Sequence, residues 1–400
     1  MECPLSGIKI IDLSNVISGP VATVLLSDQG AEVIKIESLD GDIVRRMGAG
    51  NGELSPSFLT ANRGKRSLAI NLKEKKGAEI IKKLALDADV FVQNFRPGVI
   101  DRIGLGYDVL KEINPRLLYV SISGFGEVGP YAQKRVYDPV IQALTGLPDI
   151  QADSENARPK MVRTIIPDKV TALTAAQAIT AGLYRREKEK GNGQHIKIAM
   201  IDATIAFLWA EGLVGLTPVG KEKNLRRGQL AQDLIFETAD GFITCGAVSD
   251  SEWTGLCAAL EQPAWLEDER FSTPLGRVLN AKERIEGMSD VLISKKSADW
   301  IERLEFHDVP CAPVLSRAEI LENEQIKANG IIYEYEHPEL GMVRQARPGA
   351  KFSESDLRKS SLAPALGEDS QEILSELGLD QSEIEKLFEA KIVFGRKKND

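Results

Sequence analysis

Residues 5–37, LSGIKIIDLSNVISGPVATVLLSDQGAEVIKIE, determine the fold that the sequence predicts. The apolar run GIKIIDLS predicts a strand, GPVATVLLSDQG predicts a helix closed by Gly30, and AEVIKIES predicts a second strand. A strand, a helix and a strand in so short a span form a βαβ unit, whose strands are parallel and whose crossover is right-handed. The chain therefore begins with a piece of parallel sheet.

The same alternation continues through about half of the chain. Further strands are expected at KRSLAINL, DVFVQNF, LLYVSISGFGEVG and HIKIAMID, and helices at KEKKGAEIIKKLALDA and ATIAFLWAEGL. This order predicts an α/β domain with a doubly wound, mostly parallel sheet. Ligands of such sheets bind outside the carboxyl ends of the strands.

The sequence changes character after this first domain, which is expected to cover residues 1–215. Residues 216–229 are polar and basic and predict a linker, whereas 230–320 predict a smaller α+β domain. That second domain should contain a hairpin in FETADGFITCG, where an Asp-Gly pair separates two apolar runs. A second linker is expected at 321–330. Residues 331–400 begin strand-like, end in an amphipathic helical tail, and should complete the large domain.

Composition describes an ordinary globular protein of 400 residues, with 43% hydrophobic and 27% charged residues, and a length that favours about two domains. A net charge of −9 argues against a general nucleic-acid binder. The apolar runs are too short for a membrane span, and the N-terminus has no basic region followed by an apolar one. A cytoplasmic location without membrane attachment is expected.

Cysteine and histidine patterns give no metal or disulfide signature. The four cysteines contain no CxxC pair, and the three histidines are equally scattered. No metal site is therefore expected. These residues are Cys3, Cys245, Cys257, Cys311, His195, His307 and His337.

Asp168 stands at the start of a long alanine-rich segment, TIIPDKVTALTAAQAITAGLYRREKEKGNG at 164–193. Pro167 places a helix start at or just after this point, and Gly191 should end the helix. Asp168 is then either a helix N-cap, worth about 1 kcal/mol, or an ionised catalytic carboxylate. The local sequence leaves both interpretations open.

Gly124, Gly126 and Gly129 match the G-x-G-x-x-G pattern of dinucleotide-binding proteins. In that pattern a helix begins within the glycines, so that its N-terminus meets the pyrophosphate. Here Pro130 and a polar stretch follow, and no helix is expected before about Asp138. The motif is interpreted as a glycine-rich loop at the carboxyl end of a strand, and a nicotinamide oxidoreductase is the least favoured function.

Four cations lie near expected strand ends: Lys73, Arg96, Arg102 and Arg135. Guanidinium groups at such places suit phosphates and carboxylates. In a chain with 50 lysines and arginines, solvated surface charge is an equally good interpretation.

Taken together, these segments resemble the class III CoA-transferase family, also called CaiB/BaiF or formyl-CoA transferase-like. The resemblance covers nearly the whole chain and rests on many segments in the same order rather than on one motif. They include PLSGIKIIDLSNVISGP, GAEVIKIE, NRGKRSLAINLK, ADVFVQNFRPGVIDRIGLGYDVLKEINPRLLYVSISGFGEVGP, GNGQHIKIAMID, DERFSTPLGRVLN, VPCAPVLS and LAPALGEDSQEILSELGL.

The resemblance implies that Asp168 is a nucleophile and that coenzyme A or acyl-CoA is a substrate, with no tightly bound cofactor. The expected CoA contacts are Val16, Ser18, Ile70, Asn71, Leu72, Lys73, Asn94, Phe95, Arg96, Arg102, Arg135, Tyr137 and Asp138. Two departures stand out. Ser38 replaces an arginine that is frequent in the family, and the glycine run of oxalate-using members is missing between Gly228 and Glu261.

Chemistry of this type passes through a mixed anhydride and an aspartyl-CoA thioester. Backbone N–H groups of Gly124 and Gly126 are candidates to stabilise the oxyanions. Arg163, Lys160 and Arg135 are candidates to bind a second carboxylate, which favours a dicarboxylate such as succinate as donor or acceptor. The resemblance also implies an interlocked homodimer.

Two other functions compete with CoA transfer. An α-methylacyl-CoA racemase of the same fold family needs a histidine base where this chain has Val136–Tyr137–Asp138, and a tyrosine of ordinary pKa is a poor base. A CoA-binding regulator without turnover would not need Asp168. The transferase is the favoured function.

Overall fold

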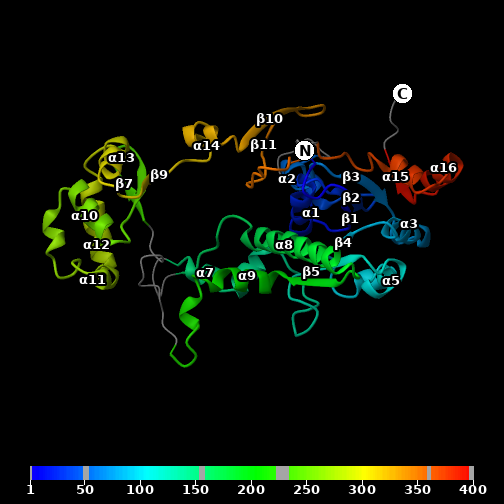
Figure 1. Ribbon diagram of the computed structural model, residues 1–400, viewed down its shortest axis with the longest axis horizontal. Coiled ribbons are helices and arrows are strands. Elements are labelled where there is room, and N and C mark those ends of the chain that lie inside the picture. The colour runs from blue at the N-terminus through cyan, green and yellow to red at the C-terminus, as the bar shows by residue number, and fades with distance from the viewer. Residues whose placement is uncertain (1, 48–53, 153–157, 222–233, 358–361, 396–400) are drawn as a thin grey trace. The chain divides into compact units, whose positions relative to one another are not determined.

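The computed structural model describes residues 2–47, 54–152, 158–221, 234–357 and 362–395 (Figure 1). The chain divides into two compact units. Unit 1 comprises Met1–Leu147, Met161–Trp209 and Ile331–Asp400, and unit 2 comprises Pro148–Lys160 and Ala210–Gly330. Each unit is described by itself.

A seven-stranded sheet forms the centre of unit 1, in the order β12-β3-β2-β1-β4-β5-β6. Strands β1 to β6 pair in parallel, whereas β12 is antiparallel to β3. The predicted α/β class with a mostly parallel sheet is confirmed. The strands are β1 (Lys9–Asp12), β2 (Glu32–Glu37), β3 (Arg66–Ile70), β4 (Val90–Gln93), β5 (Leu118–Ser123), β6 (His195–Ala199) and β12 (Val393–Phe394).

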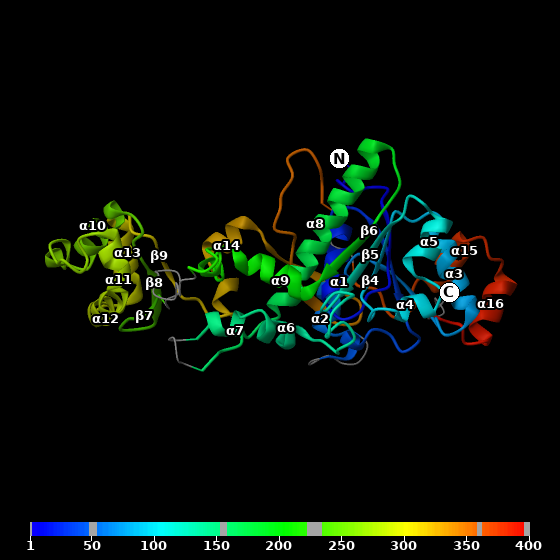
Figure 2. The same cartoon turned by 90° about the horizontal axis from the view of Figure 1, so that it is seen from below.

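Helices cover both faces of this sheet (Figure 2). Because successive side chains of a strand point to opposite faces, Ile10 and Val90 pack with α1 (Ser18–Asp28) and α8 (Ile166–Glu189). Their neighbours Ile11 and Phe91 belong to the core on the other face. That face is covered by α3 (Lys75–Ala85), α5 (Tyr107–Ile113), α15 (Ser370–Glu376) and α16 (Gln381–Glu389).

The polar region after β2 holds structure that the sequence interpretation missed. A 3₁₀ helix, η1, spans Ile43–Arg46, and α2 spans Pro56–Asn62. The Ser55 Oγ accepts the Phe58 N–H at 3.1 Å, and Pro56 occupies the first turn of α2. Remaining elements of unit 1 are α4 (Val99–Arg102), α6 (Asp138–Leu144), α9 (Met200–Trp209) and the hairpin β10 (Ile332–His337) to β11 (Gly341–Ala346).

The C-terminal segment differs from the single helical tail that was expected. It forms α15 and α16, separated at Gly378, whose φ of 80° lies in the left-handed region. Asp380 and Glu383 form a capping box that starts α16. After α16 comes β12, where Val393 pairs with Ile70 at the edge of the sheet.

Unit 2 contains the sheet β7 (Ile235–Glu237), β8 (Phe242–Cys245) and β9 (Cys311–Pro313). The predicted Asp-Gly hairpin joins β7 to β8, with the Thr238 N–H donating to the Gly241 carbonyl at 2.9 Å. Part of the expected linker 216–229, from residue 222 onward, lies outside the described residues. The second expected linker, 321–330, is mostly helical, because α14 spans Glu324–Asn329. Helices of this part of the chain are α7 (Leu147–Ile150), α10 (Asp250–Ala259), α11 (Pro274–Leu279), α12 (Ala281–Leu292), α13 (Ser297–Phe306) and α14 (Glu324–Asn329), with 3₁₀ turns at Val214–Leu216, Pro263–Leu266 and Glu319–Leu321.

None of the helices in the described ranges combines the length and the apolar character that crossing a bilayer requires.

Candidate functional site

The candidate site lies along one edge of the unit 1 sheet. Because β1, β3, β4 and β5 run in the same direction, their carboxyl ends share this edge. Ligands of open α/β sheets bind at such an edge. The loops that follow these ends carry Val16 and Ser18 after β1, residues 70–73 after β3, residues 94–102 after β4, and residues 124–138 after β5.

Asp168 is the third residue of α8, so it is not the N-cap of this helix. The N-cap is Ile165, which has no side chain able to accept a hydrogen bond. The Asp168 N–H donates instead to Oδ2 of Asp138, on α6, at 3.1 Å. The Asp168 side chain is half-buried and hydrogen-bonds to the hydroxyl and the backbone N–H of Ser18.

Burial raises the pKa of the Asp168 carboxyl to about 6. The hydrogen bonds from Ser18 act in the opposite direction, and the negative charge of Asp138 raises the pKa further. A helix start was expected to keep this group ionised at neutral pH, and a pKa of about 6 is compatible with that. The pKa is nevertheless above the ordinary aspartate value, because desolvation and a second carboxylate act on Asp168 more strongly than its hydrogen bonds do.

Two side chains, the half-buried Asn94 and the buried Asp42, hold the loop between β1 and α1. Asn94 accepts the Asn15 N–H at 2.8 Å and donates to the Asn15 carbonyl at 2.7 Å. The next residue, Val16, has a φ of 71°, a strained conformation for a β-branched residue, and its N–H donates to the Asp42 carboxylate. Asp42 pairs with Lys35 at 3.1 Å, and the side chains of both are fully buried. The contacts of Asn94 and Asp42 with the backbone of residues 15 and 16, called the clamp below, fix the loop that places Ser18 beside Asp168.

The other expected contacts divide into buried and exposed groups. Ile70 is buried, and Leu72 and Phe95 pack against the same core. The Asn71 N–H donates to the Ile392 carbonyl, and the Asn71 Oδ1 accepts the Lys73 N–H. The exposed cations make no ion pair within the part of the chain that the structure describes. They are Lys73, Arg96, Arg102 and Arg135.

The glycine-rich loop runs from Gly124 to Tyr137, and α6 begins only at Asp138. No helix therefore starts among the described glycines of this loop, as the sequence predicts. A Cβ on Gly124 would lie 2.5 Å from Val136, so this position requires glycine, while the Gly126 N–H already donates to Ser123 Oγ at 3.1 Å.

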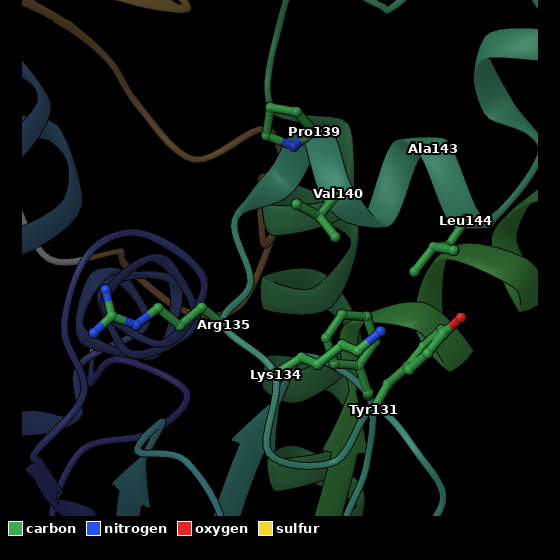
Figure 3. Close-up of a pocket in the computed structure, with 8 residues that line it drawn as sticks. Tyr131, Lys134, Arg135, Pro139, Val140, Ala143 and Leu144 are labelled. Carbon is green, nitrogen blue, oxygen red and sulfur yellow. The ribbon is translucent and has the colours of Figure 1, made fainter.

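A cavity of about 410 Å³ lies between this loop and the outer face of α6. In Figure 3, Lys134 lies over the ring of Tyr131, with its Nζ 3.6 Å from the ring centroid, and Arg135 extends away from both. The lining residues are Phe125, Tyr131, Lys134, Arg135, Pro139, Val140, Ala143 and Leu144.

The histidine that a racemase would need is not found in these loops. His195 is the first residue of β6, at the amino end of that strand, where its Nε2 lies 2.8 Å from Ser121 Oγ. His307 belongs to unit 2, and His337 ends β10. Tyr137, at the matching position, is 66% exposed.

A family model described as CoA-transferase family III matches residues 5–370. The chain belongs to CoA-transferase family III. The predicted enzyme class and family are therefore confirmed. A solved CaiB/BaiF family protein from Brucella suis has a TM-score of 0.81 and 31% identity, covering 94% of this chain and 100% of that one.

Curated members of the family match nearly the whole chain. The succinyl-CoA:glutarate CoA-transferase of Homo sapiens is 35% identical over 98% of this chain and 90% of its own length. The formyl-CoA:oxalate CoA-transferase of Streptomyces coelicolor is 32% identical over 96% of this chain and 97% of its own length.

Lys35 and Asp42, which hold the strained loop of this family III member, were missed by the sequence interpretation. Lys35 sits in the apolar run VIKIE of a strand, and a charged residue at such a place requires a buried partner. That signal was present in the sequence, but the identity of the partner was not.

Proposed function

We propose that the chain transfers CoA from an acyl-CoA to a free carboxylic acid, with Asp168 as the covalent nucleophile. The observation that carries this proposal is the environment of the Asp168 carboxyl, which is half-buried, bonded to Ser18 and has a pKa of about 6. At pH 7 such a group is ionised by about ten to one. Partial burial also limits access of the water that would hydrolyse an acyl intermediate.

The reaction consists of paired exchanges. A carboxylate oxygen of Asp168 attacks the thioester carbonyl, and the C–S bond breaks. This step forms a mixed anhydride and releases CoA as the thiolate. The thiolate attacks the Asp168 carbonyl carbon, which releases the donor acid and leaves an aspartyl-CoA thioester. The acceptor carboxylate then repeats the two steps in reverse, which regenerates Asp168 without net proton transfer.

The CoA phosphates are assigned to the exposed cations of the same sheet edge, Lys73, Arg96, Arg102 and Arg135. Cations that lack an internal partner are available for phosphate oxygens, and guanidinium groups bind these in a bidentate manner. Of the two oxyanion candidates, the Gly126 N–H is engaged by Ser123. The proposal therefore keeps the Gly124 N–H.

For the second substrate we propose a dicarboxylate such as succinate. The human relative is named for succinyl-CoA and glutarate and the Streptomyces relative for formyl-CoA and oxalate. Succinate, glutarate and oxalate are dicarboxylates, whereas formate is not. Arg163, exposed and five residues before Asp168, is a candidate for the distal carboxylate, as is Arg135. Lys160, the third residue considered from the sequence, belongs to unit 2. Mass spectrometry of thioesters formed from matched mono- and dicarboxylic acids tests this, and exchange with monocarboxylates alone would contradict it.

The nucleophile is tested with Asp168→Ala and Asp168→Asn. Both variants should lose CoA exchange while still binding CoA, because the cations of the sheet edge are unchanged. When wild-type protein is incubated with acyl-CoA and the reaction is then quenched, mass spectrometry of the peptide containing Asp168 should detect the acyl or CoA adduct. An Asp168→Ala variant with full exchange activity would exclude the mechanism.

We further propose, from family membership, that the protein is a homodimer. Exposed apolar side chains on α8 and α9 support this assembly, and they include Leu173, Tyr184 and Phe207.

A further inference from the structure

Gln142 lies one helical turn after Asp138 on α6, and both side chains are buried, with 2% and 3% exposure. The Gln142 Nε2 donates to Oδ1 of Asp138 at 2.6 Å. It also lies 3.3 Å from the carbonyl oxygens of Val162 and Thr164. The Gln142 Oε1 accepts the Val162 N–H at 3.1 Å.

These contacts allow only one orientation of the Gln142 amide. The Val162 N–H needs an acceptor, so the oxygen must face it, and the NH₂ group must face the Asp138 carboxylate and the two carbonyls. Rotating the amide by half a turn would place its NH₂ group against the Val162 N–H, donor against donor. Its oxygen would then face the Asp138 carboxylate and the two carbonyls, which are all acceptors. Gln142 thus joins α6 to the segment that leads into α8.

This segment needs such support because α8 begins without a side-chain cap of its own. The first N–H groups of a helix have no partner within the helix, and Ile165 cannot supply one. Asp138 takes the N–H of Asp168 with one oxygen, while its other oxygen is held by Gln142. The start of α8 is therefore capped from another helix.

We propose that Gln142 is a positioning residue for the nucleophile: it fixes Asp138 and residues 162–164, and through them the orientation of Asp168 toward the thioester. The inference rests on the proposed function of Asp168 and adds a residue that acts on the reaction without contacting substrate. Displacing a reacting group by about 1 Å reduces turnover by about 100-fold in well-oriented sites.

Gln142→Met tests the proposal, because methionine has a similar length and makes none of these hydrogen bonds. We expect kcat for CoA exchange to fall about 10- to 100-fold, with KM for acyl-CoA within about twofold of wild type. Gln142→Glu keeps the acceptor for the Val162 N–H but has no N–H for Asp138 and the two carbonyls, so kcat should fall in this variant as well. Gln371→Met, at an exposed position of α15, is the matched control and should keep wild-type kcat.

The pH profile separates positioning from general stability. The side chains that act on the Asp168 carboxyl are Asp138 from α6 and Ser18 from α1. Without Gln142, the Asp138 carboxylate is no longer fixed against the start of α8, so its charge acts on Asp168 from a different position. The acidic limb of kcat should therefore move in Gln142→Met, a shift that a loss of folded protein would not produce.

A double-mutant cycle with Asp138→Asn completes the test. If Gln142 acts through Asp138, the double variant should be no slower than the slower single variant, whereas additive losses in kcat would overturn the proposal. If Asp168→Ala is inactive but a folded Gln142→Met keeps the wild-type kcat and pH profile, the role of Gln142 is overturned. If Asp168→Ala still exchanges CoA, the proposed function itself is rejected. If Gln142→Met does not fold, Gln142→Glu and Asp138→Asn give the same comparison.

Discussion

Asp168 combines two properties that rarely occur together in a carboxylate. Partial burial and the nearby Asp138 raise its pKa to about 6, while Ser18 binds the charged form. The group is therefore ionised at neutral pH but less strongly solvated than a surface aspartate, which favours attack on a thioester. Its environment comes from α1 and α6, not from its own helix.

The rate of CoA exchange should depend on the ionisation of this one residue. We expect kcat/KM to be constant above about pH 7 and to fall about tenfold per unit below about pH 6, because only the carboxylate attacks. Initial rates with saturating acceptor across this range measure the limb. A limb near the ordinary aspartate value of about 4 would contradict a desolvated nucleophile.

Asp168 should also lower the stability of the folded protein at neutral pH. Its folded pKa is raised, so the native state binds a proton more tightly than the unfolded chain, and stability falls as pH rises from about 4 to about 6. Asp168→Asn should increase the free energy of unfolding at pH 7 by up to about 3 kcal/mol, and by much less near pH 4. Urea unfolding at both pH values checks this, and an equal change at both would contradict it.

At the scale of elements, the loop between β1 and α1 is held in a strained conformation by residues from two other loops. Val16 has a positive φ, and conformations of this kind persist only where the surroundings enforce them. Asn94, after β4, and Asp42, after β2, provide that enforcement through the backbone of residues 15 and 16. The expected CoA-contact residue Asn94 thus has its side-chain amide engaged by the protein.

Asn94→Leu should release this loop. It removes two hydrogen bonds, at about 1 kcal/mol each, and should lower kcat because Ser18 no longer holds Asp168 in place. Asn114→Leu is a matched control, since Asn114 also binds backbone groups, at Ala85 and Ala88, away from the sheet edge. Similar losses in thermal stability, with a loss of kcat only in Asn94→Leu, are expected. Equal kcat in the two variants would exclude the clamp.

At the scale of the whole molecule, α8 and α9 expose several large apolar side chains. Leu173, Tyr184 and Phe207 are 60%, 69% and 58% exposed. Single exposed apolar residues are common, but several on two packed helices are typical of an interaction surface. Family membership makes a second copy of the chain the proposed occupant.

Light scattering should give the mass of a dimer for the wild-type protein. Leu173→Arg combined with Phe207→Arg should shift it toward the monomer, because buried unpaired charges oppose association. Leu86→Arg, at an equally exposed leucine outside these helices, should leave the dimer intact. A wild-type monomer at micromolar concentration would contradict the assembly.

The sequence by itself determined the α/β class, the parallel strands and the loop character of the glycine motif, because apolar periodicity and turn residues are local signals. The family came from the resemblance of many segments in the same order. The local sequence left Asp168 as helix cap or nucleophile, and only the resemblance favoured the nucleophile. The division of the C-terminal tail and its return to the sheet as β12 also depended on long-range pairing.

Only the tertiary structure decided what surrounds Asp168. Ser18, Asp138 and Gln142 lie 150, 30 and 26 residues from it in the chain, and nothing local links them to its carboxyl or backbone. Gln142 had one local signal, its position four residues after Asp138 on a helix, which places both on the same face. The pKa of Asp168 was beyond reach of the sequence for the same reason, because desolvation and the charge of a neighbour are properties of packing.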